Sequence, residues 1–313
     1  GDDYFDTYVN VIGALDGDLL PTSKFTEFEL LDGTMNPNIT YKEQRSIADR
    51  VPLWNKDACI QCNQCAFVCP HATIRPFLLT EEELANAPEI VKADVKDAMG
   101  PQAKGLKYRL QVSPKNCVGC GLCVAECLAN KTAEKLGKPK ALTMTDAKSQ
   151  FGQEEAAEYL YKHTEYKSNI FPTNSAKGVG FLMPYMEISG ACAGCGETPY
   201  YRLLSQLFGK DLLIANATGC SSIYSGSTPL TPFCTDKNGE GVAWANSLFE
   251  DNAEFGYGFR ISADHKLAKI AEILQTALKE ETTEEALKEA ITTYLANIKD
   301  REAARIVVPT LVT

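Results

Sequence analysis

The chain has 313 residues, of which 44% are hydrophobic and 23% are charged, a composition typical of a globular protein large enough for two domains. Because 41 acidic residues outnumber 31 basic ones, the formal net charge is -10, which argues against nucleic-acid binding. The first residues lack the pattern of a signal peptide and no stretch approaches 18 consecutive apolar residues, so we expect a cytoplasmic protein without membrane association.

Residues 1–50 combine mixed polarity with turn signals and show no sustained period, so they are interpreted as a lead-in segment. A cysteine-rich module of two similar halves follows over residues 51–150. Within it, residues 106–112 alternate between apolar and polar side chains, which predicts a half-buried strand, and residues 141–145 predict another extended segment.

Two short helical patterns, at 81–85 and 94–99, indicate an insertion between the halves of the module. Residues 151–176 are polar and partly helical and are predicted to form a linker. The remaining residues, 177–313, contain buried strands predicted at 178–187 and 212–216, with a helix at 199–209 between them. This order of elements is typical of an α/β domain.

Two amphipathic helices are predicted near the end of the chain, and the second begins with the capping box Thr282-x-x-Glu285. Their apolar faces are carried by residues 267–278 and 286–298. Residues 305–313 have the composition of a buried strand. Because that strand would end the chain and the sequence starts at Gly1 instead of Met, we expect a fragment of a longer polypeptide.

Most of the 12 cysteines lie two or three residues apart, which favours metal binding in a reducing compartment over a disulfide framework. Two runs share the spacing C-x-x-C-x-x-C-x-x-x-C, and they consist of Cys59, Cys62, Cys65 and Cys69 and of Cys117, Cys120, Cys123 and Cys127. This spacing is typical of ferredoxin-type modules with two [4Fe-4S] clusters, in which the fourth cysteine of each run starts a helix and binds the other cluster. We therefore predict one cluster on Cys59, Cys62, Cys65 and Cys127 and another on Cys69, Cys117, Cys120 and Cys123.

Zinc is the alternative metal that these cysteines could bind. Structural zinc sites usually need two pairs of ligands separated by a dozen or more residues, and triplets at i, i+3 and i+6 do not fit that pattern. Pro70 follows the first run, as expected for a cluster-binding module, whereas Leu128 follows the second.

Three further cysteines, Cys192, Cys195 and Cys220, follow predicted strands of the α/β part, where ligands collect in such folds. From the residues alone they could bind a third cluster, or a zinc ion with Cys234 as fourth ligand. Glu197 lies beside them at a predicted helix start, where the helix dipole favours a carboxylate in any protein.

The segments Gly190-Ala-Cys192-Ala-Gly-Cys195-Gly-Glu197 and Thr218-Gly-Cys220-Ser-Ser, downstream of a two-cluster module, resemble the pyruvate:ferredoxin (flavodoxin) oxidoreductases. The resemblance implies an α+β two-cluster ferredoxin-like module followed by part of an α/β thiamine-diphosphate-binding domain. It also implies that Cys192, Cys195 and Cys220 hold the cluster nearest the thiamine diphosphate, and that Glu197 and Cys220 line the cofactor pocket. The fourth ligand of this cluster and the magnesium motif would lie beyond Thr313, and no catalytic residue is assigned.

The activity implied by this resemblance is the oxidative decarboxylation of pyruvate with coenzyme A to acetyl-CoA and CO2, with electrons passing through three [4Fe-4S] clusters to ferredoxin or flavodoxin. Thiamine diphosphate, Mg2+, the rest of the polypeptide and a homodimeric partner belong to that expectation. The alternatives are a non-catalytic iron-sulfur electron-transfer subunit and an oxidoreductase for another 2-oxoacid.

Overall fold

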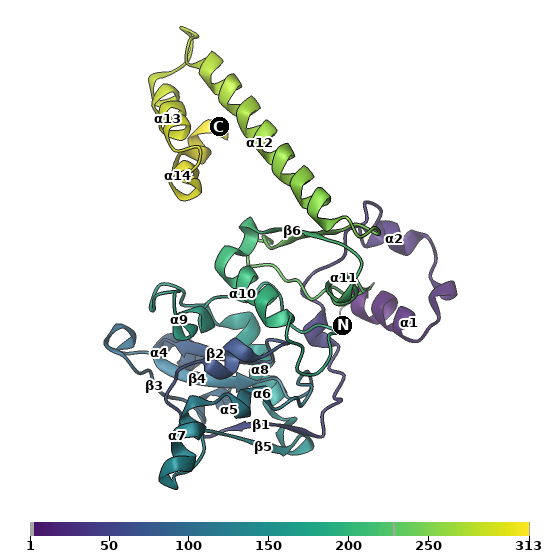
Figure 1. Cartoon of the computed structure of the whole chain (residues 1–313), viewed down its shortest axis with the longest axis vertical. Coiled ribbons are helices and arrows are strands. Elements are labelled where there is room, and N and C mark those ends of the chain that lie inside the picture. Colours follow the sequence, from purple (N-terminus) through teal and green to yellow (C-terminus); the bar gives the residue numbers. More distant parts are fainter. Residues whose placement is uncertain (1–2, 228, 313) are drawn as a thin grey trace. The chain divides into compact units, whose positions relative to one another are not determined.

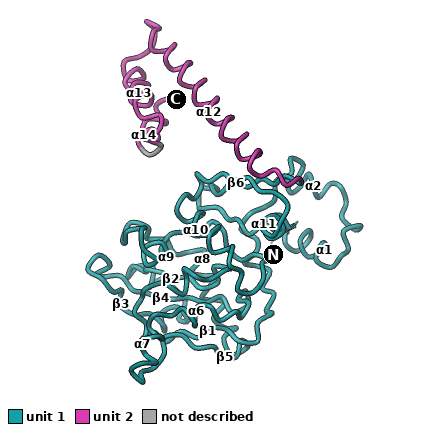
Figure 2. The backbone as a smooth tube through the Cα atoms, in the orientation of Figure 1, with its two compact units in different colours: residues 1–248 teal, residues 249–313 magenta. Residues whose placement is uncertain are grey.

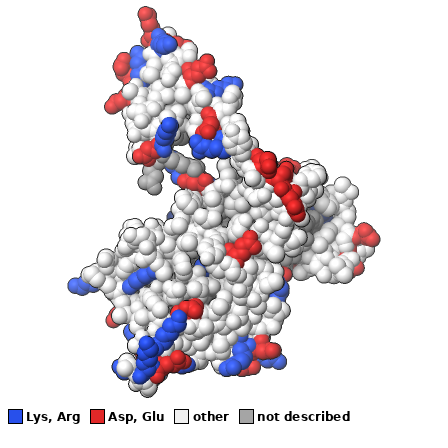
Figure 3. All heavy atoms as spheres, viewed as in Figure 1, with Lys and Arg blue, Asp and Glu red and all other residues white. Residues whose placement is uncertain are grey.

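The computed structural model describes residues 3–227 and 229–312, except for the side chains of residues 301 and 302. The chain divides into two compact units, residues 1–248 and 249–313 (Figure 2). On the face drawn in Figure 3, basic and acidic side chains are interspersed and form no continuous basic stripe. Within the described residues, no helix combines the length and apolarity needed to cross a membrane.

The N-terminal segment forms short helices with a small apolar core of its own, made by Tyr4, Tyr8, Val9 and Ile39. It is tied to a distant part of the chain, because the Tyr4 hydroxyl donates to the carbonyl of Pro229 at 3.1 Å. The helical elements are the π-helix Phe5–Val9, α1 (Asn10–Gly13), the 3-10 helix Gly17–Leu19, α2 (Ser23–Glu27) and the 3-10 helix Thr40–Lys42.

The cysteine-rich module is built on two small antiparallel sheets (Figure 1). In one, β1 (Arg50–Trp54) pairs with β5 (Leu142–Asp146), so the two ends of the module lie side by side. In the other, the strand order is β2 (Ile74–Leu79), β4 (Lys107–Val112) and β3 (Lys96–Asp97). The helices of the module are α3 (Gln64–Val68), α4 (Glu81–Asn86), α5 (Glu89–Lys92), the 3-10 helix Pro101–Ala103, α6 (Leu122–Ala125), α7 (Leu128–Leu136) and the 3-10 helix Lys148–Gln150.

The strand predicted at 106–112 is confirmed as β4, but it is buried on both faces instead of one. Its polar face is covered by α8 (Gln153–His163), where the Arg109 guanidinium donates to the side-chain oxygen of Gln153 at 2.9 Å. Helix α8 lies in the predicted linker, and its buried residues pack with Phe77, Leu79 and Val91. This part of the linker is therefore folded onto the module. The helix predicted at 94–99 is wrong, because those residues include the short strand β3.

The second part of this unit contains α9 (Ala176–Gly180), α10 (Thr198–Phe208), the 3-10 helix Gly209–Asp211, β6 (Leu213–Asn216), α11 (Cys220–Ser225) and β7 (Ala243–Asn246). Strands β6 and β7 pair in parallel. The helix at 199–209 and the strand at 212–216 are confirmed, but the strand at 178–187 is wrong. Its first residues form α9, because the Ser175 hydroxyl caps that helix by accepting from the Gly178 amide at 3.2 Å.

The second unit, described by itself, consists of α12 (Asn252–Ala277), α13 (Glu285–Ala296) and α14 (Arg301–Val312). The two predicted helices are confirmed as α12 and α13, but α12 begins before the predicted residues, and Leu267, Ile270 and Ile273 on its apolar face are exposed. The predicted capping box is not formed, because Glu284 occupies the N-cap position and makes no capping bond through its side chain. The strand predicted at 305–313 is also wrong, because residues 305–312 belong to α14. A short apolar run does not distinguish a strand from a helix. Thr313 lies outside the described residues.

Candidate iron-sulfur centres

A first cavity of about 300 Å³ is lined by four cysteines, and these are the four predicted to share a cluster. Cys59 and Cys62 come from the loop before α3, Cys65 from α3 and Cys127 from the N-cap of α7. The rest of the lining is mainly apolar and includes Tyr108, Leu110, Ala141 and Leu142.

A second cavity of about 360 Å³ is lined by the other predicted set, Cys69, Cys117, Cys120 and Cys123. Each cavity thus receives three cysteines from one run and the fourth from the other. Cys127 precedes α7 as predicted for a fourth ligand. Cys69 differs from the prediction, because it ends α3 and is followed by β2 instead of a helix.

The two runs bend around their cavities with the same backbone conformation. Gln61 and Gly119, each two residues after the first cysteine of a run, have φ values of 54° and 70°, and Asn63 and Gly121 repeat the match at 60° and 77°. In both runs an amide points at the first thiol, since the Gln61 nitrogen lies 3.4 Å from Cys59 Sγ and the Gly119 nitrogen lies 3.4 Å from Cys117 Sγ. Donors of this kind help to set the reduction potential of a cluster.

The first run places Gln61 and Asn63 in a left-handed conformation that normally favours glycine. Both side chains are buried and form hydrogen bonds. Gln61 donates to the carbonyl of Asp97 at 2.8 Å, whereas Asn63 donates to the carbonyl of Lys177 at 2.8 Å and accepts from the Tyr108 hydroxyl at 2.9 Å. These residues were missed by the sequence reasoning, although Asn is one of the few side chains that often adopts this conformation.

Burial keeps the thiols of the two cavities in their neutral form. Burial raises the pKa of Cys65, and the nearby thiols Cys123, Cys59, Cys62 and Cys127 raise it further. Burial likewise raises the pKa of Cys117 to about 12. Because thiolates are the metal-binding form, such cysteines need a cationic centre to ionise at neutral pH.

The arrangement of the thiols favours a cluster over a single ion. Among the described residues, no three His, Cys, Asp or Glu side chains converge closely enough to hold one metal ion. Four cysteines nevertheless surround each cavity. Thiols that line a common space without converging on one point suit the separate irons of a cubane better than a tetrahedral zinc ion.

The loop that carries Cys192 and Cys195, two of the third group of cysteines, lies beside the second cavity. A Cβ atom built on Gly194, between Cys192 and Cys195, would lie 3.8 Å from Cys120 Cβ. Cys192 and Cys220 are exposed and Cys195 is partly buried. Glu197 occupies the N-cap position of α10, and Cys220 is the first residue of α11.

Tyr224 on α11 is the common neighbour of this third group. Its pKa is raised by burial and then by the proximity of Glu197, Tyr201, Cys195 and Cys220. The Tyr224 hydroxyl is buried and has no hydrogen-bond partner among the described residues. A buried hydroxyl that lacks a partner is consistent with a site that is completed by groups from elsewhere.

Cys234 is not grouped with these cysteines. It is buried, its thiol donates to the carbonyl of Pro184 at 3.1 Å, and it borders a different cavity together with Arg75 and Glu187. The structure therefore gives no support to a zinc site with Cys234 as fourth ligand.

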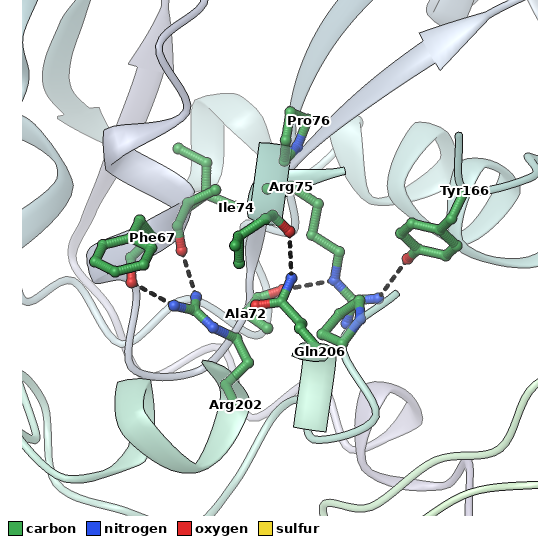
Figure 4. A pocket seen from close by; sticks show the side chains of 12 residues that line it. Phe67, Ala72, Ile74, Arg75, Pro76, Tyr166, Arg202 and Gln206 are labelled. Atoms are coloured by element: carbon green, nitrogen blue, oxygen red, sulfur yellow. Dashed lines mark hydrogen bonds between the residues drawn. The ribbon is translucent and has the colours of Figure 1, made fainter. Parts of the chain in front are cut away.

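Two buried arginines join the module to the segment that carries Cys192 and Cys195 (Figure 4). Arg75 on β2 pairs with Glu187 at 2.6 Å, and both side chains are at most 7% exposed. Arg202 on α10 donates to the carbonyls of Ala66, Phe67 and Cys69 around the end of α3. Burial lowers the pKa of Arg202 to about 10, which still leaves it cationic at neutral pH. No sequence pattern indicated these contacts, because they join residues more than a hundred positions apart.

His71 is the third buried polar residue at this junction. It is 1% exposed, borders the second cavity and lies with Nδ1 3.4 Å from the Ser189 hydroxyl, while Nε2 has no partner among the described residues. Burial lowers the pKa of His71 to about 4, and the nearby Arg45 acts in the same direction. The imidazole is therefore neutral at physiological pH.

Comparisons with known proteins agree with this geometry. A family profile described as "4Fe-4S dicluster domain" matches residues 58–131. The chain is 46% identical, over 94% of its length, to the pyruvate:ferredoxin oxidoreductase of Moorella thermoacetica, and 46% identical over 92% to the pyruvate-flavodoxin oxidoreductase of Klebsiella pneumoniae. It is 40% identical over 91% to the probable pyruvate-flavodoxin oxidoreductase of Escherichia coli. It spans about a quarter of the length of these relatives, 24%, 23% and 24% respectively.

Proposed function

We propose, from the premise that this chain is homologous to one segment of the pyruvate:ferredoxin (flavodoxin) oxidoreductases, that it forms the electron path of such an enzyme. The complete protein would oxidise pyruvate with coenzyme A to acetyl-CoA and CO2 and reduce ferredoxin or flavodoxin. Thiamine diphosphate with Mg2+ would supply the carbanion chemistry of the decarboxylation, and one-electron iron-sulfur clusters would accept the electrons.

The observation that carries this proposal is the sorting of eight cysteines into two cavities of four, across the two sequence runs. Cys59, Cys62, Cys65 and Cys127 would hold one [4Fe-4S] cluster, and Cys69, Cys117, Cys120 and Cys123 another. Cys192, Cys195 and Cys220 would supply three ligands of a third cluster. Glu197 and Cys220 would border the thiamine diphosphate, and the remaining ligands would come from the longer polypeptide.

The positions of the cavities support an order for electron transfer. The second cavity is the neighbour of the Cys192–Cys195 loop, because Gly194 packs near Cys120. The first cavity is bordered by Ile60, which is 47% exposed, and Cys127 is followed by Leu128, which is 45% exposed. We infer that electrons pass from the third cluster to the second cavity, then to the first cavity, and from there to the soluble acceptor.

Residues 177–313 are assigned in this proposal to the first part of the thiamine-diphosphate-binding domain. The parallel pairing of β6 and β7 supports an α/β domain, since parallel strands are typically parts of larger, covered sheets. Thr198, Tyr224 and Asn246 each have a buried polar side-chain atom without a partner among the described residues. We expect further strands and partners for these atoms from the rest of the polypeptide, in a cytoplasmic homodimer.

Iron and acid-labile sulfide analysis of the anaerobically purified chain tests the proposal. About 8 irons per chain would mean that the two module clusters form alone, and about 12 that the third site also fills. A chain that binds zinc, or neither metal, would refute the proposal. In the complete protein, coenzyme A-dependent reduction of ferredoxin and flavodoxin should be faster with pyruvate than with other 2-oxoacids, and equal or higher rates with another acid would reassign the substrate.

A further inference from the structure

The guanidinium groups of two buried arginines, Arg75 and Arg202, line the cavity drawn in Figure 4. The charge of Arg75 is balanced by Glu187 at 2.6 Å. Arg202 is 4% exposed and forms no ion pair with an acidic residue in the part of the chain that the structure describes. A buried cation normally needs a nearby negative charge, because its transfer out of water is costly.

The contacts of Arg202 point to the source of that negative charge. Its guanidinium donates to the carbonyl of Cys69 at 2.9 Å and also to the carbonyls of Ala66 and Phe67. These carbonyls satisfy part of its hydrogen-bonding capacity, but they are neutral. Cys69 is the fourth thiol of the second cavity and interacts electrostatically with Arg202, so a cluster bound there would bring the negative charge of its thiolates and sulfides near this guanidinium.

We propose that Arg202 is the positioning and potential-setting residue of the cluster held by Cys69, Cys117, Cys120 and Cys123. This inference rests on the proposed cluster ligation. One-electron reduction makes the cluster more negative by one charge, so a fixed cation nearby stabilises the reduced form and raises the reduction potential. Arg202 lies one turn into α10, and the same side chain therefore also fixes the helix that follows Cys195 against this cluster.

The consequence for electron transfer is directional. With Arg202 beside it, the second cluster would be easier to reduce than without it. It would therefore accept electrons more readily from the neighbouring Cys192–Cys195 site. The first cavity has Lys177 near Cys62 as its neighbouring cation, but that side chain is only partly buried, whereas Arg202 is buried. Arg202 would thus set the potential at the entry to the module.

The test is a potentiometric titration of the complete protein, followed by electron paramagnetic resonance, for wild type, Arg202→Gln and Arg202→Lys. A Cys59→Ala background removes the cluster of the first cavity, so that the second can be followed. We expect Arg202→Gln to lower the equilibrium constant for reduction of the second cluster about tenfold, equivalent to about 59 mV for a one-electron couple. Arg202→Lys keeps the charge and should retain most of the wild-type potential.

Arg109→Gln is the matched control, because Arg109 is also a buried arginine that donates to carbonyls, those of Val91 and Asp94. It lies on the face of β4 opposite Tyr108 and Leu110, which line the first cavity, so its removal should leave both module potentials unchanged. If Arg202→Gln fails to retain iron, Gln206→Glu provides the second variant. Gln206 borders the same cavity one turn further along α10, and a carboxylate there should partly neutralise Arg202 and lower the same potential.

Unchanged potentials in Arg202→Gln or in Gln206→Glu, at unchanged iron content, would overturn this inference alone. A shift in Arg202→Lys as large as that in Arg202→Gln would also overturn it, because the charge would then not be the cause. A wild-type protein without iron and sulfide would instead refute the proposed function.

Discussion

The crossed assignment of cysteines can be tested by combining substitutions within and between the two cavities. Cys127 lies in the second sequence run but lines the first cavity with Cys59. Cys117 lies in the same run as Cys127 but lines the second cavity. Pairs of substitutions therefore distinguish ligation across runs from ligation within runs.

The expected magnitudes follow from the four cysteines around each cavity. Each single substitution to alanine removes one of four ligands and should cost one cluster, about 4 irons per chain. Cys59→Ala with Cys127→Ala should also cost about 4 irons, because both affect one site. Cys117→Ala with Cys127→Ala should cost about 8, because two sites are affected.

Iron and sulfide analysis after anaerobic purification measures these losses, and Cys234→Ala serves as control, since this buried thiol lies outside both cavities. The reasoning is refuted if Cys117→Ala with Cys127→Ala loses a single cluster while Cys59→Ala with Cys127→Ala loses both. That outcome would mean that each run binds its own cluster.

Three further predictions concern the buried polar contacts and the close packing around the module. The pKa of His71 is about 4 in the folded chain and 6.5 in its ordinary state. The unfolded chain therefore takes up the proton first as the pH falls. The stability that neutral His71 contributes is complete above pH 6.5 and is lost toward pH 4, by roughly 3 kcal/mol in total. His71→Gln should weaken the dependence of the urea-unfolding midpoint on pH between pH 7 and 4.5. A midpoint that depends on pH as steeply as in the wild type would contradict the assignment. Glu187→Gln leaves Arg75 buried without its counter-ion, so we expect a loss of about 3 kcal/mol in the free energy of unfolding. The double variant with Arg75→Met should recover much of this loss. Additive losses in the double-mutant cycle would argue against coupling of the two residues. Gly178→Ala would press a Cβ against the backbone carbonyl oxygen of Pro172 and should lower the thermal midpoint strongly, whereas Gly152→Ala, with nothing within 4 Å, should not. Similar midpoints would refute this packing.

The sequence alone predicted the chemistry of the module, because cluster ligation depends on short, regular spacings. The run from Cys59 to Cys69, repeated from Cys117 to Cys127, specifies how the backbone wraps around a cubane, and this information is local. The strands at 106–112 and 212–216 and the helix at 199–209 were predicted for the same reason, since their periodicity or length is local.

The errors arose where a local pattern was ambiguous or where a distant element covered it. The apolar residues at 178–187 resemble a strand, yet a capping hydroxyl at Ser175 starts a helix there. The alternation at 106–112 suggests one wet face, yet α8 from the supposed linker covers it and buries Arg109. Residues 305–312 were predicted as a strand and form a helix, because a short apolar run is compatible with both structures.

By itself, the sequence predicted which cysteines are grouped around each of the two cavities, and it indicated the family that the chain resembles. Only the tertiary structure decided what surrounds those groups: that Gly194 packs near Cys120, that His71 is buried between the second cavity and Ser189, and that Arg202 contacts Cys69 without an acidic partner. The physical reason is that ligation follows from spacings of a few residues. The electrostatic environment of a cluster depends on side chains more than a hundred residues away, which only the folded chain brings together.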